Sequence, residues 1–104
     1  MRMHNTPHPG LVLREYLSRI AISMAAKHLR ISRVTLSRVL NAKAGISANM
    51  ALRLASALGT SAEFWVNMQA QYDLWRARRV RQPAVRRFPQ MAHVGENNPL
   101  SVVS

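Results

Sequence analysis

Apolar residues recur at spacings of three and four in five separate stretches of the chain, a pattern typical of helices with one buried face. We predict a first helix over residues 11–20, two short helices within residues 23–41, a fourth over residues 48–58 and a fifth over residues 62–79. The expected buried faces of the first four consist of Leu13, Tyr16, Leu17 and Ile20; Ala25, Ala26 and Leu29; Leu36, Val39 and Leu40; and Ala51, Leu54, Ala55 and Leu58. The pattern therefore predicts an all-α domain with one core.

Small polar residues and glycines mark where these helices should begin and end. A serine precedes each of four predicted helices, at Ser23, Ser32, Ser47 and Ser61, where its hydroxyl can accept a hydrogen bond from an unpaired backbone N–H. Gly59 should end the fourth helix, because glycine readily adopts the left-handed conformation. Gly10 should mark the point at which the chain enters the first helix.

The stretch 23–41 reads as a helix-turn-helix, two short helices joined by a tight turn. With one face of its second helix buried, the outward positions are Arg33, Val34, Thr35, Ser37 and Arg38. Cations, hydroxyls and methyl groups suit a helix laid in the major groove of DNA, where Arg meets guanine and a methyl group meets thymine. The alternative is a helical hairpin with a solvated polar face, and this stretch alone leaves it open.

The strongly basic composition indicates that the binding partner is anionic. The net charge of +11 comes from 15 Lys and Arg against 4 Asp and Glu, which suits nucleic acid, a membrane surface or an acidic protein. The absence of cysteine excludes a disulfide scaffold, a thiol nucleophile and a Cys-ligated zinc site. Apolar runs are too short for a membrane span, and the N-terminus lacks a signal-peptide core, so we expect a soluble cytoplasmic protein with no membrane partner.

Histidine is the remaining candidate for metal or acid–base chemistry. His4 and His8 are four residues apart, but Pro7 and Pro9 disfavour a helix there, so we expect both to be solvated rather than metal ligands. His28, beside Lys27 and Arg30, would be the centre of a ribonuclease, but the four acids are scattered and form no dyad. We therefore predict no enzyme, no catalytic residue, no metal and no cofactor. A small basic RNA-binding protein or ribonuclease is the rival interpretation.

The predicted fifth helix carries more aromatic surface than one end of a small bundle usually hides. Phe64, Met68, Tyr72 and Trp75 form one stripe, which Trp65 and Leu74 widen. This stripe is either core or an interface with a second copy or a partner, and we favour the interface.

The character of the chain changes after this helix. Residues 76–87 contain six arginines, and Pro83 should stop any helix. We divide the chain into a polar N-terminal arm over residues 1–9, a helix-turn-helix domain over residues 10–80 and a basic, irregular and mostly flexible tail over residues 81–104. Beside a helix-turn-helix, such a tail can add contacts to DNA phosphates.

The chain resembles HigA-type antitoxins, also labelled plasmid-maintenance antidote or virulence-associated protein I (VapI), within the Cro/XRE-like helix-turn-helix class. The resemblance runs over residues 8–79 and is carried by HPG (8–10), LRE (13–15), TLSRVLN (35–41), GIS (45–47), MALRLA (50–55), GTSAEFW (59–65), NMQ (67–69) and YDL (72–74). It implies a five-helix, lambda-repressor-like DNA-binding domain that forms a homodimer.

The resemblance also implies a role. Proteins of this kind bind double-stranded operator DNA, repress their own operon and neutralise a HigB-type toxin, a ribosome-dependent mRNA endonuclease. By position, Arg33, Val34, Thr35, Ser37 and Arg38 would face bases or groove. Ser23 and Lys43 would lie at the DNA backbone.

The chain departs from the class in two respects. Arg30 stands in the inter-helix turn where the class often has glycine, and a left-handed Arg costs about 1 kcal/mol. The toxin expected by family analogy is also basic, so simple attraction between opposite charges cannot drive its binding. A stand-alone transcriptional regulator without a toxin is therefore the alternative function.

Overall fold

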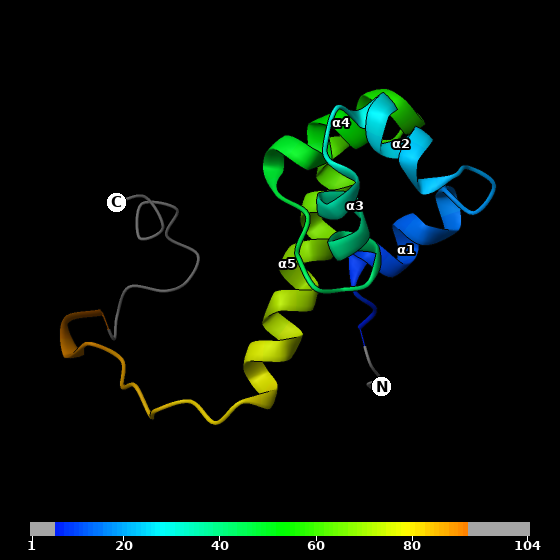
Figure 1. Cartoon of the computed structure of the whole chain (residues 1–104). Helices are drawn as coiled ribbons and strands as arrows, with labels where there is room; N and C mark the ends of the chain where they lie inside the picture. Colours follow the sequence, from blue (N-terminus) through cyan, green and yellow to red (C-terminus); the bar gives the residue numbers. More distant parts are fainter. Residues whose placement is uncertain (1–5, 92–104) are drawn as a thin grey trace.

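A computed structural model describes residues 6–91 of the chain, so His4 and residues 92–104 of the predicted tail lie outside the described part. Residues 6–91 contain five α-helices and one short 3₁₀ helix, with no strand among them. These are α1 (Pro9–Tyr16), α2 (Ile22–Leu29), α3 (Arg33–Leu40), α4 (Ala48–Leu58), α5 (Ala62–Arg79) and η1 (Pro89–Met91). The predicted all-α fold is confirmed, and Figure 1 shows α1 to α4 gathered around the first part of α5.

The core is built around Trp65 of α5. This side chain is fully buried, and its indole Nε1–H donates to the hydroxyl of Thr60 at 2.7 Å. Fully buried leucines from three other helices complete the centre of the core, Leu13, Leu36 and Leu54. Helix α5 packs on α4 and α1. Helix α3 packs on α1 and α2, so these two helices support its buried face.

Three of the four predicted serine caps are confirmed, and one is wrong. The hydroxyls of Ser32, Ser47 and Ser61 accept hydrogen bonds from backbone N–H groups in the first turns of α3, α4 and α5. Helix α2 instead begins at Ile22, which packs against the core, and its N-cap Ala21 supplies no side-chain acceptor. Ser23 is therefore an exposed residue inside the first turn of α2.

The first helix begins and ends earlier than its hydrophobic pattern predicts. It starts at Pro9, which lacks an N–H and so suits a first helical position. It ends at Tyr16, which leaves Tyr16 and Ile20 about half exposed, whereas Leu13 and Leu17 are buried as predicted.

His8 caps this helix. Its Nδ1 accepts a 2.8 Å hydrogen bond from the Gly10 backbone N–H, and only 6% of the residue is exposed. The prediction of a solvated His8 in a polar arm was wrong, because the ring replaces water as the acceptor at the start of α1. Pro9 is buried with it.

Gly10 does not lead into the helix but lies within it, at the crossing of α1 and α3. A Cβ atom on Gly10 would lie 1.8 Å from the carbonyl oxygen of Val39, far inside van der Waals contact. Because this oxygen belongs to the α3 backbone, no side-chain rotation can relieve such a clash.

Among residues 6–91, no helix is both long and apolar enough to cross a membrane.

Gly10→Ala should therefore destabilise the domain by more than Gly59→Ala. The first variant overpacks the crossing of α1 and α3, which typically costs about 1–3 kcal/mol or more. The second places alanine at a φ of 76° with open space around it, a strain of about 1 kcal/mol. Urea unfolding followed by circular dichroism measures both, and equal losses would show that α1 moves away from α3 at little cost.

Candidate nucleic-acid interface

Helix α3 presents a polar outer face on an apolar base. Leu36, Val39 and Leu40 are buried. The opposite face carries the predicted set: Arg33, Val34, Thr35 and Arg38 are exposed, and Ser37 is half-buried. The structure thus separates the two faces as predicted and brings the candidate residues together on one helix, while their contacts with DNA stay a prediction.

The N-terminal end of α3 is tightly organised. The Ser32 hydroxyl accepts from the Thr35 backbone N–H at 2.9 Å and donates to the Thr35 hydroxyl at 2.8 Å. The Thr35 hydroxyl thereby keeps its own hydrogen and its methyl group for an external partner. The first turn of α3 contains no acidic residue, so the positive end of its dipole remains available to an anion.

The C-terminal end of α3 is held by hydrogen bonds that were not predicted from the sequence. Asn41 donates to the carbonyl and the hydroxyl of Ser37, at 2.9 and 3.3 Å, and accepts from Arg14 of α1 at 2.9 Å. Arg38 donates to the Lys43 carbonyl at 3.2 Å. Ser37 and Arg38 are therefore partly engaged within the chain, and Arg14 joins the candidate surface. The position of Asn41 at the predicted end of this helix was the one feature of the sequence that pointed to a capping role.

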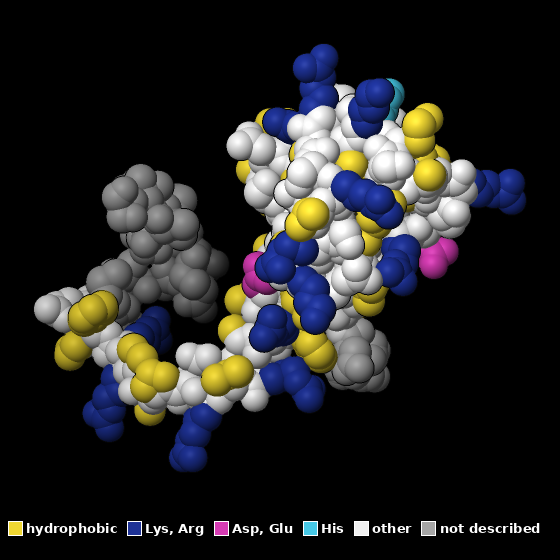
Figure 2. Space-filling model, viewed as in Figure 1, with side chains coloured by type: hydrophobic (Ala, Val, Ile, Leu, Met, Phe, Trp, Pro, Cys, Tyr) yellow, Lys and Arg dark blue, Asp and Glu magenta, His cyan; other side chains and the backbone are white. Residues whose placement is uncertain are grey.

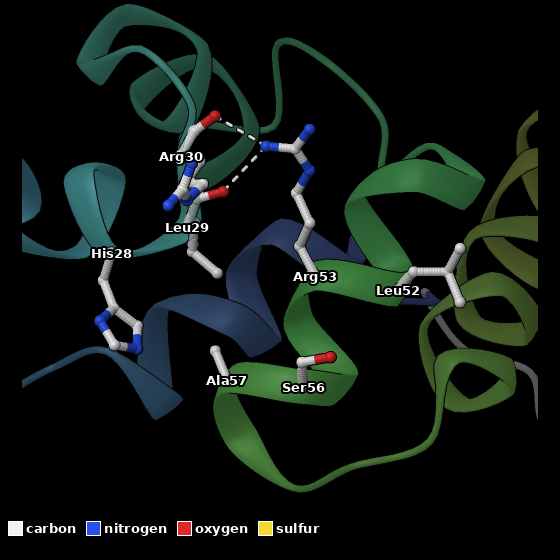
Figure 3. A pocket seen from close by; sticks show the side chains of 7 residues that line it. All are labelled: His28, Leu29, Arg30, Leu52, Arg53, Ser56 and Ala57. Carbon is white, nitrogen blue, oxygen red and sulfur yellow. Dashed lines mark hydrogen bonds between the residues drawn. The ribbon is translucent and has the colours of Figure 1, made fainter.

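The turn between α2 and α3 shows the predicted left-handed conformation at Arg30, with φ 62° and ψ 44°. Arg53 reaches across from α4, and one amino group of its guanidinium donates to the carbonyls of Leu29 and Arg30 at 3.0 and 2.7 Å (Figure 3). These carbonyls end α2 and have no further helical partner, so a cation is well placed there. This contact was not predicted from the sequence, because Arg53 lies 24 and 23 residues from Leu29 and Arg30.

Positive charge surrounds this helix. Figure 2 shows Lys and Arg side chains spread over the face that carries α3 and along the chain after α5, with few acidic side chains among them. Lys43 and Ser23, the predicted backbone contacts, are both exposed. No group of three His, Asp or Glu side chains within the described residues could hold a metal ion.

The predicted aromatic stripe of α5 is used in part within the chain. Trp65, beside the stripe, is the core residue, while Phe64 is 38% exposed. Met68 packs against the core, and Tyr72 and Trp75 are half-buried. The Tyr72 and His8 rings pack edge to face with their centroids 4.7 Å apart, and the Arg79 guanidinium lies 4.9 Å from the centre of the Trp75 ring. The stripe is thus neither pure core nor a wholly free face.

Burial gives His8 an unusual electrostatic setting. Desolvation lowers the pKa of His8 below its ordinary value of 6.5, opposed by Asp73 and reinforced by Arg76. The ring must also remain unprotonated at Nδ1 to accept from Gly10. The folded domain therefore favours neutral His8.

Comparison with known proteins relates this surface to a family. A family model described as helix-turn-helix matches residues 13–65. Virulence-associated protein A' of Dichelobacter nodosus is 47% identical over 76 residues, which cover 70% of this chain. The chain spans 66% of that relative's length.

Two solved structures share the fold and were determined with DNA. The antitoxin HigA of Pseudomonas aeruginosa, with the higBA promoter, is 39% identical, with a TM-score of 0.68 over 70% of this chain and 83% of that one. The antitoxin GraA in complex with its operator is 30% identical, with a TM-score of 0.68 over 82% of this chain and 98% of that one.

His8 should make the stability of the domain depend on pH. The pKa of His8 is lower in the folded state than the value of 6.5 in the unfolded chain. Above pH 6.5 the ring is neutral in both states, so it does not change the free energy of unfolding. As the pH falls below 6.5, the unfolded chain binds a proton more readily than the folded domain, so the domain loses stability. The loss cannot exceed about 1.4 kcal/mol per pH unit from one group. Urea unfolding between pH 7.5 and 5 measures it. His8→Asn keeps a capping acceptor without a titrating ring, so an equally steep pH dependence in that variant would contradict the assignment.

Proposed function

Since this chain belongs to the Cro/XRE-type helix-turn-helix family, we propose that it is a sequence-specific DNA-binding antitoxin that represses its own operon. It is a DNA-binding, antitoxin-like protein of the toxin–antitoxin or plasmid-maintenance type, in a family of DNA-binding proteins rather than enzymes. The observation that carries the proposal is the outer face of α3, whose exposed Arg33, Val34 and Thr35 stand on a fully packed base.

Recognition would rest on the N-terminal half of α3. In a helix-turn-helix, this half of the second helix reaches the base edges of the major groove. Arg33 has no hydrogen bond within the described part of the chain, so its guanidinium is available for bidentate binding to guanine. The Val34 side chain, 69% exposed, offers a contact to a thymine methyl group.

Contacts with the phosphate backbone would come from both sides of α3. Ser23 lies in the first turn of α2, and Lys43 lies in the loop after α3. We place the domain boundary near residue 80, where α5 gives way to extended backbone, and propose that the exposed Arg81, Arg86 and Arg87 add affinity without sequence preference. A protein with this task works where the DNA is, in the cytoplasm.

We propose that the protein acts as a homodimer paired through α5. The support is the aromatic stripe: Phe64 and Trp75 keep exposed surface at one side of the helix, while Met68 and Tyr72 anchor the stripe to the domain. Two-fold pairing would set the two α3 helices about 34 Å apart, one turn of DNA.

The proposed protein partner is a HigB-type toxin, an mRNA endonuclease. Neutralisation by a chain of net charge +11 has to rely on apolar contact and hydrogen bonding rather than on charge attraction to a basic toxin. The same charge favours the second candidate, a stand-alone regulator with no toxin. Co-expression and co-purification with the protein encoded beside this gene separates the two.

Arg33→Ala should weaken binding to the duplex upstream of its own reading frame by about 1–3 kcal/mol and change binding to a shuffled duplex little. The reason is that Arg33 is expected to read base edges rather than phosphates. Fluorescence anisotropy at fixed salt measures both affinities. Arg19→Ala, which removes an exposed charge outside the helix-turn-helix, is the matched control. Equal losses on both duplexes would reassign Arg33 to a phosphate.

Phe64→Glu/Trp75→Glu should convert the dimer to a monomer that remains helical, because each chain would bring two carboxylates into the buried interface without a compensating charge. Sedimentation velocity measures the assembly, and circular dichroism checks the fold. Leu74→Glu is the comparison variant, since Leu74 lies at the edge of the stripe, about 100° of rotation from its neighbour Trp75. If only Leu74→Glu dissociates the dimer, the pairing face includes the exposed Val66 and Leu74 instead.

A further inference from the structure

A small polar groove lies between the start of α1, the loop after α3 and the middle of α5. Its walls include His8, Lys43, Gly45, Gln69, Asp73 and Arg76, and its volume is about 130 Å³. Pockets for drug-sized ligands measure about 300–1,000 Å³, so this groove suits a single small group. The residues come from three segments that are distant in sequence, which the fold alone brings together.

The lining of the groove includes a buried donor. The Nδ1 atom of His8 accepts from Gly10, so in the neutral ring the hydrogen is on Nε2. Edge-on packing against Tyr72 holds the ring, and the residue is 6% exposed. Within residues 6–91, Nε2 has no hydrogen-bond partner. A buried N–H without an acceptor is unusual in proteins, so this donor is available to a ligand that enters the groove.

The loop supplies further donors. Ala42, at the start of the groove-lining loop, adopts a left-handed conformation with φ 58°. The Ile46 N–H donates to Gln69 at 2.7 Å, and Gln69 in turn donates to Asp73 at 3.0 Å, so these two side chains hold the loop on α5. By contrast, the N–H groups of Ala44 and Gly45, which both line the groove, donate to no acceptor in the described part of the chain.

The charge of the groove is positive. Lys43 and Arg76 contribute two cations against the single carboxylate of Asp73, one oxygen of which already accepts from Gln69. A group that presents several acceptor oxygens and a negative charge would satisfy the His8 ring, the loop amides and both cations together.

We propose that this groove binds one phosphate group, held by His8 Nε2–H, Lys43 and Arg76. For one source of that phosphate, the DNA backbone, the proposal rests on the proposed function, because Lys43 lies in the loop just after α3 and its carbonyl accepts from Arg38. A backbone phosphate bound here would fix the C-terminal end of α3 on the duplex. The other source is free phosphate or a small phosphate ester.

The first experiment needs no DNA. Inorganic phosphate is titrated into the ¹⁵N-labelled full chain at pH 7.5, with ionic strength held constant by chloride. The Ala44 and Gly45 amide signals should shift and saturate. Arg76→Gln should weaken phosphate binding at least ten-fold, while Asp73→Asn should tighten it by removing the opposing charge.

The matched control is Arg78→Gln, which removes the same charge from α5 outside the groove and should leave phosphate binding unchanged. His8→Asn keeps an acceptor for Gly10 but loses the Nε2 donor, so it should weaken phosphate binding with the fold intact. If His8→Asn does not fold, the Arg76→Gln and Asp73→Asn variants still test whether the groove binds phosphate. Non-saturating shifts, or equal effects of Arg76→Gln and Arg78→Gln, would overturn the proposal.

The second experiment identifies the source. If the phosphate belongs to DNA, Arg76→Gln weakens binding to operator and shuffled duplexes alike and lowers the salt slope by about 0.9 per chain, whereas Arg78→Gln does so less. If phosphate saturates the groove but Arg76→Gln and Arg78→Gln leave DNA affinity equal, the ligand is a free phosphate compound. Should the chain not bind DNA at all, the proposed function fails while the phosphate titration still tests the groove.

Discussion

The orientation of α3 depends on a contact without side chains, the approach of Gly10 in α1 to the carbonyl of Val39 in α3. A Cβ at position 10 would lie 1.8 Å from that oxygen. The two helices can therefore approach this closely only when residue 10 is glycine. From this crossing follow the burial of the apolar base of α3 and the reach of Arg14 to Asn41 at its far end. His8, which caps α1 through the Gly10 N–H, belongs to the same junction.

Sequence periodicity predicted the elements well where the signal was local. The bounds of α5 and the caps at Ser32, Ser47 and Ser61 follow from residues within a few positions of each other. The α2 cap was predicted wrongly, because Ile22 starts its helix by packing on the core. The start of α1 was predicted too late, because histidine, unlike Ser or Asp, is not an expected capping residue. The end of α1 was predicted too late as well.

The candidate site also has features that could be predicted from local sequence and features that could not. The outward set on α3 follows from helical spacing alone, so the exposure of Arg33, Val34 and Thr35 was predictable. The bonds from Arg53 to the Leu29 and Arg30 carbonyls link residues 24 and 23 positions apart, and the groove lined by His8 joins three segments. The hydrophobic pattern of a single helix cannot predict such contacts, because they depend on how the helices pack against one another.

The hydrogen bonds around α3 are unequally distributed, and this bears on how related sequences diverge. Ser37 and Arg38 are tied to Asn41 and to the loop, so replacing them disturbs the support of the helix. Arg33 and Val34 have no such ties within the described part of the chain. Duplicated genes could therefore exchange residues 33 and 34 freely and acquire new DNA targets while keeping one scaffold, whereas drift at residues 37 and 38 would be selected against even where the target stays the same.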